Sequence, residues 1–166
     1  MNLGLSNMLK SEFKNYIQVE KPLINTETIP DPKWLSGFVS GEGCFDVNIS
    51  KSTNKLGYRA QLRFRISQHI RDIKLMESIS KYLGSGNIYK YPNQEAVSFY
   101  IVNLNDLTNI IIPFFNVNPL GGAKLFDYLD WCKIAKLLND GKHLTVEGLD
   151  RIRTIKSKMN TGRKDK

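Results

Sequence analysis

Apolar and polar residues alternate along two neighbouring stretches of the chain, residues 45–52 and 58–67. Successive side chains of a β-strand point to opposite faces, so this alternation predicts two half-buried strands. Turn-forming residues between them, at 52–57, favour pairing of the two strands as a hairpin. The side chains expected to face the core are Phe45, Val47, Ile49, Tyr58, Ala60, Leu62, Phe64 and Ile66.

A second, weaker hairpin is expected further along the chain. Ile88 marks its first strand, and a Pro-Asn pair at 92–93 supplies the turn. Apolar residues alternate along its second strand at Val97, Phe99 and Ile101. The side chains that would then face away from the core are Asn87, Tyr89, Tyr91, Gln94, Ser98 and Tyr100.

The clearest helix start stands at Asp31-Pro32. Aspartate caps a helix amino end well, and proline fits the first helical position. A helix is therefore expected from about Pro32 to Gly41. Helical spacing predicts further helices at 73–83, 104–112, 124–138 and 145–159, with Gly84 and Pro113 ending the first two of these.

Two antiparallel hairpins with helices gathered on one face predict an α+β fold whose other sheet face is polar. A chain of 166 residues is long enough for one hydrophobic core. Residues 31–160 are expected to form this domain. Residues 1–30, with a short helix at Leu9–Tyr16, are interpreted as an arm or linker, and residues 161–166 as a basic tail.

Charge narrows the choice of partner. Lysine and arginine outnumber the acids 24 to 16, giving a formal charge of +8 and a pI near 9.5, which favours a polyanion. Cys44 and Cys132 lie in apolar sequence surroundings without ligand spacing, so neither zinc nor a disulfide is indicated. No apolar run approaches a membrane span, and residues 1–13 lack a signal peptide's apolar stretch. A soluble protein without a membrane partner is expected.

The positive charge is concentrated on the first hairpin, where six basic residues stand between Asp46 and Arg71 against Asp46 alone. Arginine, glutamine, asparagine and serine can read base edges in a major groove, which admits a two-stranded ribbon. A solvated polar face is the alternative interpretation. The hairpin residues expected at DNA are Asp46, Asn48, Ser50, Ser52, Asn54, Lys55, Arg59, Gln61, Arg63, Arg65 and Ser67.

The second hairpin would extend the same face with Asn87, Tyr89, Tyr91, Gln94, Ser98 and Tyr100. Tyrosines suit contacts with methyl groups and sugars better than contacts with phosphate. The remaining basic residues are assigned to phosphate contacts or to solubility; they are Lys51, Lys55, Arg151, Arg153, Lys156 and Lys158.

The helix that begins at Pro32 runs into Leu-Ser-Gly-Phe-Val-Ser-Gly-Glu-Gly at residues 35–43. Small residues three and four apart leave one side of this helix nearly bare, so a second copy could cross it closely at a two-fold axis. Leu35, Phe38 and Val39 would root the helix in its own core. The residues expected at the crossing are Leu35, Ser36, Gly37, Ser40 and Gly41.

Glu42 is the unusual residue of this segment. At the carboxyl end of a helix the dipole disfavours an anion, and a two-fold mate would place a like charge nearby. Divalent cations between the two carboxylates would relieve that repulsion, and phosphodiester cleavage uses metals to activate water. Glu42 and the Gly41 carbonyl are therefore the predicted metal ligands.

Residues 35–43 resemble the nine-residue motif of the LAGLIDADG homing endonucleases. Leu35, Gly37, Gly41 and Gly43 match its pattern, and Glu42 falls at its metal-binding acidic position. The expected αββαββα order matches as well, from about Pro30 to the late helices. Ser40 departs from the motif's frequent first acidic residue, at a position with a structural role.

The resemblance implies site-specific cleavage of double-stranded DNA with staggered ends, on a saddle-shaped sheet, with Mg²⁺ or with Mn²⁺ or Ca²⁺ in its place. One-motif members work as homodimers on long, near-palindromic targets, and two-motif members are single-chain pseudo-dimers. Residues 1–30 look like the linker before the second half of a two-motif fungal enzyme. The partner is therefore a second copy or a related amino-terminal half. A mitochondrial location is implied.

Two further catalytic residues follow from the resemblance alone. Gln68 closes the second strand beside the polar face, where the family uses a polar residue to position the attacking water. Lys124 matches a region with a basic residue near the scissile phosphates, although a surface lysine is an equal alternative. Two other functions stay open: an RNA-splicing maturase, and a non-cutting DNA-binding module that uses the motif to dimerise. Neither His69 nor His143 is expected to form a site.

Overall fold

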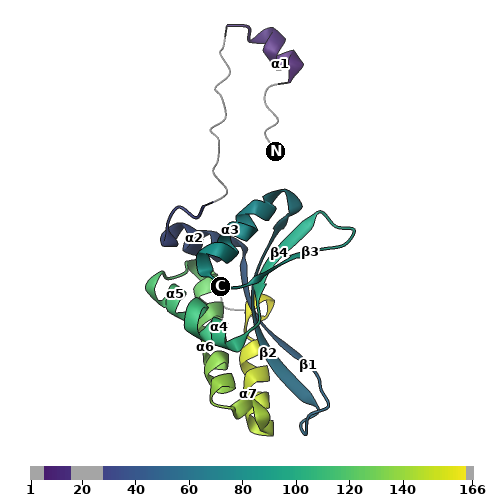
Figure 1. Cartoon of the computed structure of the whole chain (residues 1–166), viewed down its shortest axis with the longest axis vertical. Helices are drawn as coiled ribbons and strands as arrows, with labels where there is room; N and C mark the ends of the chain where they lie inside the picture. Colours follow the sequence, from purple (N-terminus) through teal and green to yellow (C-terminus); the bar gives the residue numbers. More distant parts are fainter. Residues whose placement is uncertain (1–5, 16–27, 164–166) are drawn as a thin grey trace.

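A four-stranded antiparallel sheet carries helices on one side in the computed structural model, which describes residues 6–15 and 28–163 (Figure 1). The strand order is β1-β2-β4-β3. From Pro32 to Val117 the elements follow the predicted αββαββα order, and two more helices, α6 and α7, follow. The predicted α+β fold is confirmed. Within the described ranges, no helix is both long and apolar enough to cross a bilayer.

The first helix, α1, spans Asn7–Glu12 and buries none of its residues. It begins earlier than the expected Leu9 because the Ser6 hydroxyl accepts a hydrogen bond from the Leu9 amide and caps the helix. It also ends before the expected Tyr16. Residues 1–5 and 16–27 of the predicted arm lie outside the described residues.

Helix α2 spans Pro32–Glu42 and starts as predicted. The Asp31 carboxylate accepts hydrogen bonds from two amides of the first turn, at 2.7 and 2.9 Å, and thereby satisfies donors that lack helical partners. Gly43 follows the last helical residue as the carboxyl-terminal cap. A Cβ added to Gly43 would lie 2.5 Å from the Val39 side chain. Glycine is therefore required for the immediate turn from helix into strand.

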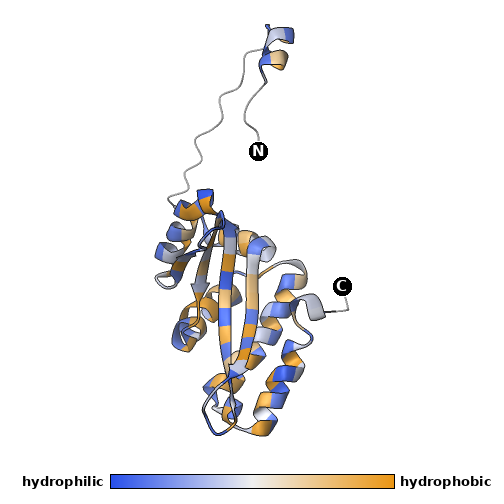
Figure 2. Cartoon of the chain, turned by 90° about the vertical axis from the view of Figure 1, so that its right-hand side faces the viewer, coloured by the Kyte–Doolittle hydropathy of each residue, from blue (hydrophilic) through white to orange (hydrophobic). Residues whose placement is uncertain are grey.

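The sheet consists of β1 (Gly43–Lys51), β2 (Tyr58–His69), β3 (Asn87–Lys90) and β4 (Ala96–Ile101). Both predicted hairpins are present. The bands of alternating hydropathy along the two long strands are visible in Figure 2. The buried side of the sheet comprises Phe45, Val47, Leu62, Phe64, Ile66, Val97, Phe99 and Ile101.

The main covering helices are α3 (Ile73–Leu83), α6 (Gly122–Asn139) and α7 (Val146–Lys156), with short 3-10 turns η1 (Ile70–Asp72), η3 (Lys142–Leu144) and η4 (Asn160–Gly162). Gly84 ends α3 in the left-handed conformation, at φ 67°, as predicted for a helix stop. Phe45 is the centre of the aromatic core, because the rings of Phe64 and Trp131 lie 5.0 and 5.3 Å from its ring.

The prediction that Pro113 ends a helix is wrong. One continuous helix runs through it, composed of α4 (Leu104–Asp106), the π-helical η2 (Leu107–Ile111) and α5 (Ile112–Val117). Proline cannot donate a backbone hydrogen bond and clashes with the preceding turn of an α-helix. The wider π-turn directly before Pro113 provides a local change of helical geometry at this position, and sequence periodicity did not predict it.

The described part of the predicted basic tail is packed against α6. Arg163 donates to the carboxylates of Asp127 and Asp130 at 3.0 and 2.7 Å, and Asp127 also accepts from the Asn160 amide. The Asn160 side chain in turn donates to the Phe45 carbonyl at 3.0 Å. This segment therefore covers the outer edge of β1. Residues 164–166 lie outside the described residues.

Candidate metal-binding end of α2 and nucleic-acid interface

Glu42 is the last residue of α2 and is exposed. The strand that follows pairs Gly43 with Ile66, so this end of α2 lies beside the final residues of β2. Gln68 stands there, two positions beyond Ile66. The alternation along β2 places Gln68 on the helix side of the sheet, with buried Ile66, and not on the polar face next to which it was expected.

Lys124 reaches the same end of the molecule from α6. It lies in the first turn of that helix, and the Gly121 amide just before α6 donates to the Ser40 hydroxyl of α2 at 2.9 Å. The Lys124 side chain is half-buried. The elements that carry the three predicted catalytic residues, α2, β2 and α6, therefore contact one another near this end of the molecule.

The oxygen donors at the end of α2 fit half of a divalent cation site. The Glu42 carboxylate is exposed, and the Gly41 carbonyl belongs to the last helical turn, whose carbonyls lack helical partners. Magnesium and calcium prefer such oxygen ligands. Across residues 6–15 and 28–163, no cluster of three or more acidic, histidine or cysteine side chains could complete a metal site. At this point the described residues therefore offer one carboxylate and one carbonyl.

The outer face of α2 is bare at its glycines. A Cβ added to Gly37 or Gly41 would meet no atom of the described chain within 4 Å, so internal packing does not require glycine at either position. Trp34 and Phe38 flank them with stacked rings 5.3 Å apart. The exposed fraction of Trp34 is 37%.

Two residues named for the helix crossing point inward. Leu35 is completely buried, in agreement with its expected role in rooting the helix in its own core. The Ser36 hydroxyl donates to the Asn118 carbonyl at 2.7 Å. Ser40 is also engaged within the chain, because its hydroxyl donates to the Ser36 carbonyl and accepts from Gly121. Among the predicted crossing residues, Gly37 and Gly41 lie on the open face, where Trp34 was not anticipated.

The polar face of the first hairpin contains paired side chains. Asp46 forms a bidentate ion pair with Arg63, at 2.7 and 3.2 Å, and the Arg59 Nε donates to the Ser50 hydroxyl at 3.2 Å. Cys44 shares this face, opposite Arg65, and so does not lie in the apolar surroundings assumed for it. The pKa of Arg65 is raised, first by a hydrogen bond with Cys44 and further by the Asp46 charge.

The remaining predicted DNA contacts of this hairpin are on the polar face or at its tip. Asn48 pairs with Gln61 across the strands, and Ser67 is exposed on the same face. The tip carries Ser52, Asn54 and Lys55, where Asn54 donates to the Tyr58 carbonyl at 2.7 Å and closes the turn. These placements agree with the expected polar face.

The second hairpin contributes tyrosines around a buried serine. Ser98 is only 3% exposed, and its hydroxyl bonds with the hydroxyls of Ser67 and Tyr91 at 2.6 and 3.2 Å. Ser98 therefore lies on the expected face of the sheet and supports that surface from below. A hollow of about 310 Å³ above it is lined by residues including Arg63, Arg65, Tyr89, Tyr91, Tyr100 and Val102. Asn87 and Gln94 are exposed at the margin.

The histidines form local contacts. The His69 Nδ1 accepts from the Arg71 amide, which leaves Nε2 to donate to the Glu95 carboxylate at 3.0 Å. The buried Nδ1 of His143 has no hydrogen-bond partner in the described part of the chain. Neither histidine lies in a ligand cluster.

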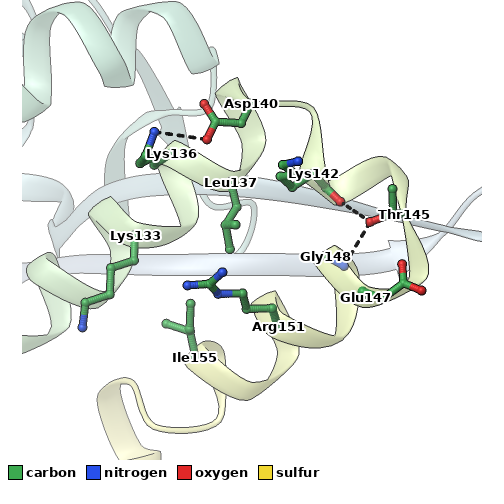
Figure 3. Close-up of a pocket in the computed structure, with 10 residues that line it drawn as sticks. All are labelled: Lys133, Lys136, Leu137, Asp140, Lys142, Thr145, Glu147, Gly148, Arg151 and Ile155. Atoms are coloured by element: carbon green, nitrogen blue, oxygen red, sulfur yellow. Dashed lines mark hydrogen bonds and ion pairs between the residues drawn. The ribbon is translucent and has the colours of Figure 1, made fainter.

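A cavity of about 510 Å³ lies between α6 and α7 and away from both features (Figure 3). Figure 3 shows the Arg151 side chain directed between Leu137 and Ile155, while Lys136 pairs with Asp140 at 3.1 Å. Charged and aliphatic side chains line this cavity, and none of the predicted site residues is among them.

Residues 35–135 match the family model described as LAGLIDADG endonuclease, over more than half of the chain. The chain is 58% identical over 153 residues to the probable intron-encoded endonuclease 3 of Neurospora crassa, covering 92% of this chain and 29% of that protein. It is 32% identical over 118 residues to an uncharacterized 50.9 kDa protein in ND4 intron 1 of Podospora anserina, covering 69% of this chain and 26% of that protein.

Solved structures of LAGLIDADG endonucleases are also similar to the chain. I-SmaMI, a LAGLIDADG homing endonuclease bound to cleaved DNA, superposes with a TM-score of 0.86 at 45% identity, covering 98% of this chain and 55% of its own. The same enzyme bound to uncleaved target in the presence of calcium ions superposes with a TM-score of 0.84, covering 97% of this chain and 55% of its own. The chain thus spans about half of I-SmaMI and under a third of these fungal relatives.

Proposed function

We propose, from the premise that this chain belongs to the LAGLIDADG endonuclease family, that it is one half of a metal-dependent, site-specific DNA endonuclease. The second half is another copy of the chain or the related half of a longer protein, because the chain covers 55% of I-SmaMI. The complete assembly cuts both DNA strands and leaves staggered ends.

The observation that carries this proposal is the exposed Glu42 carboxylate at the end of α2. The packing of the described chain does not require glycine on the outer face of this helix. Gly37 and Gly41 leave room for a second helix backbone to cross α2. Such a crossing brings a second Glu42, or its counterpart, close to the first. Two carboxylates and two helix-end carbonyls then supply the oxygen ligands that one chain lacks.

The residues at the end of α2 have distinct roles in the proposed reaction. Glu42 and the Gly41 carbonyl hold a divalent ion, whose chemistry is to activate water and stabilise the leaving oxygen. Gln68 orients the attacking water through its amide from the helix side of the sheet. Lys124 supplies positive charge at the phosphate being cleaved. The structure of I-SmaMI in the presence of calcium ions supports a divalent ion in the proposed enzyme. Magnesium is the proposed natural ion.

The polar face of the sheet is proposed to read the target. Arginine, glutamine and asparagine side chains face outward from β1 and β2, and tyrosines extend the surface over β3 and β4. I-SmaMI is bound to DNA in its crystal structures, which supports duplex DNA as the ligand. Each half reads half of a long target, and two copies would read a near-palindrome.

The proposed place of action is a fungal mitochondrion. The support is that one relative is encoded in an ND4 intron of Podospora anserina and another is intron-encoded in Neurospora crassa. A protein made inside the organelle would need no import signal.

Cleavage of a plasmid library with randomised inserts tests the proposal. Purified chain is incubated with the library with Mg²⁺ and without it, and cut molecules are sequenced. We expect Mg²⁺-dependent cuts at one recurring site, together with a dimer mass in light scattering. If the chain is a monomer, mixing with the separately expressed amino-terminal half of a fungal relative should restore cutting. Specific binding without cutting in either mixture would contradict the enzyme and favour a DNA-binding module.

A further inference from the structure

Asp46 is the one acid on the polar face of the first hairpin, within the described residues, and it contacts two arginines. Its Oδ1 accepts from the Arg63 Nε at 2.7 Å and its Oδ2 from the Arg63 Nη2 at 3.2 Å. The Arg65 Nε lies 3.5 Å from Oδ2. The Asp46 side chain is 15% exposed, whereas the arginines are 37% and 43% exposed.

An acid here is costly for a surface that binds a polyanion. It repels phosphates and cancels one of the positive charges that attract them. Base reading by Asp46 itself would require an open carboxylate that accepts from a cytosine amino group. In the structure both carboxylate oxygens already accept from Arg63. Asp46 therefore acts on the arginine more directly than it could act on a base.

The geometry of the pair leaves the useful end of Arg63 free. A guanidinium has five N–H donors in a rigid fork, and Asp46 uses the side formed by Nε and Nη2. The end formed by Nη1 and the second Nη2 proton stays available. This pair of donors matches the O6 and N7 acceptors of guanine, the commonest specific contact of arginine in a major groove.

Asp46 is itself fixed from below. The buried Trp131 donates its indole N–H to the Asp46 carbonyl at 3.2 Å, and the next carbonyl along β1, that of Phe45, accepts from Asn160. By contrast, Arg59 on the same face is held only by a neutral partner, the Ser50 hydroxyl at 3.2 Å. The two arginines therefore differ in how firmly they are oriented before any ligand arrives.

We propose that Asp46 is a specificity-determining positioning residue, which holds Arg63 for end-on recognition of a guanine and weakens non-specific attraction to DNA. The inference rests on the proposed DNA-binding role of the sheet and assigns one partner, guanine, to one side chain. Asp46 thereby lowers the affinity for DNA of any sequence and raises the discrimination between sequences. It fixes the Arg63 side chain before DNA binds, and it cancels a positive charge that any phosphate would attract.

The test is Asp46→Asn in the full chain, with binding measured to a randomised duplex pool and to a random-sequence control duplex. Asparagine keeps the shape and loses the charge. We expect affinity for the control duplex to rise on the order of fivefold and its salt dependence to steepen by about one unit. We expect the preference for guanine at one target position to fall by about tenfold.

Two control variants separate the effects. Arg63→Lys should lose the same guanine preference without the gain in non-specific affinity, because lysine keeps the charge but has no fork. Asp140→Asn removes an acid from the helical side, where it pairs with Lys136, and should change neither quantity. Thermal melting of each variant checks that the fold is retained.

Opposite changes in affinity and discrimination are the signature of the proposed role. If Asp46→Asn loses target affinity but keeps the Arg63-dependent guanine preference, Asp46 reads a base directly and the inference fails. If both affinities fall together with the melting temperature, the pair is structural and the inference fails equally. A wild-type chain with no sequence preference in the pool would overturn the proposed DNA-reading function itself, which is a different result.

Discussion

The carboxyl end of α2 and the polar face of the sheet differ in how complete they are within one chain. The end of α2 offers one exposed carboxylate, Glu42, and a helix face left open at two glycines. The sheet face already contains hydrogen-bonded side chains. Asp46 accepts a hydrogen bond from Arg63, and the Ser98 hydroxyl bonds with those of Tyr91 and Ser67. One region has few internal partners, and the other is arranged before any ligand binds.

This difference indicates a division of labour in the proposed enzyme. Recognition of a half-target needs many side chains held in fixed positions, and one folded sheet can supply them. Metal-dependent cleavage needs several oxygen ligands around one ion, and a single helix end cannot supply them. Assembly of two halves would therefore switch on chemistry while leaving the reading surface of each half unchanged.

The largest expected effect is at the incomplete region. Glu42→Gln should reduce Mg²⁺-dependent nicking by about three orders of magnitude, a loss typical for removal of a key electrostatic group. Binding to the selected target should stay within about twofold, because Glu42 is not on the polar face. Nicking gels and a binding titration measure the two quantities. Continued cutting by this variant would remove Glu42 from the metal site.

Two glycines of the α2 region provide a matched pair of variants: Gly43, which follows the helix, and Gly37, on its open face. Gly43→Ala should lower the free energy of unfolding by about 2 kcal/mol, because its Cβ would lie 2.7 Å from the Val39 carbonyl oxygen. Gly37→Leu should raise the stability of the single chain by about 0.5–1 kcal/mol, since leucine is the better helix former. The same variant should abolish self-association and cutting. Denaturant unfolding and light scattering distinguish them, and unimpaired assembly of Gly37→Leu would refute the helix crossing.

The sheet face should respond differently at its centre and at its tip. Replacement of Arg63 or Gln61 should change which sequences are bound, at a cost of about 1–3 kcal/mol for the original target. Lys55→Ala, at the hairpin tip, should weaken all targets alike and reduce the salt slope by about one unit. Selection from a randomised pool at two salt concentrations measures both. An equal loss for every sequence in the Arg63 variant would show that Arg63 contacts phosphate.

The smallest expected effect on function concerns the support of the sheet edge. Arg163→Ala should lower stability by about 2 kcal/mol at neutral pH, because Asp127 and Asp130 lose a partly buried partner. It should not affect the intrinsic rate of cutting.

The effect should depend on pH. Burial opposes ionisation of Asp130, but hydrogen bonds from Lys133 and Arg163 outweigh it and hold the pKa of Asp130 below its ordinary value. The stability from such a group is present above the unfolded pKa and is lost as the pH falls through the folded one. The deficit of Arg163→Ala should therefore shrink in acid. Urea unfolding at neutral and acidic pH measures it; a constant deficit would assign the effect to packing.

Local patterns were sufficient for most of the fold. Alternation located both hairpins, and Asp31 with Pro32 located the start of α2, because these signals arise from backbone geometry and capping within a few residues. The same rules failed at Pro113, where the helix continues after a π-turn. Proline signals a stop in an α-helix, and periodicity contains no information about a local change of helix type.

The candidate site was only partly predictable. Glu42 could be found because an acid at a helix end beside glycines is unusual in sequence alone. The inward direction of Ser36 could have been inferred from its spacing with Val39, since residues three apart share a helix face. The pairing of Asp46 with Arg63 could have been inferred once the hairpin register was known, because the register places them directly opposite.

The sequence by itself determined the elements of this protein, its polar sheet face and the candidate metal-binding carboxylate, since each depends on residue type and short-range periodicity. Tertiary structure alone decided which small residues of α2 remain open, how α6 brings Lys124 towards that helix, and which arginine Asp46 holds. These features join residues from 17 to 81 positions apart in the chain. Such contacts depend on packing of the whole core, which local sequence patterns do not specify.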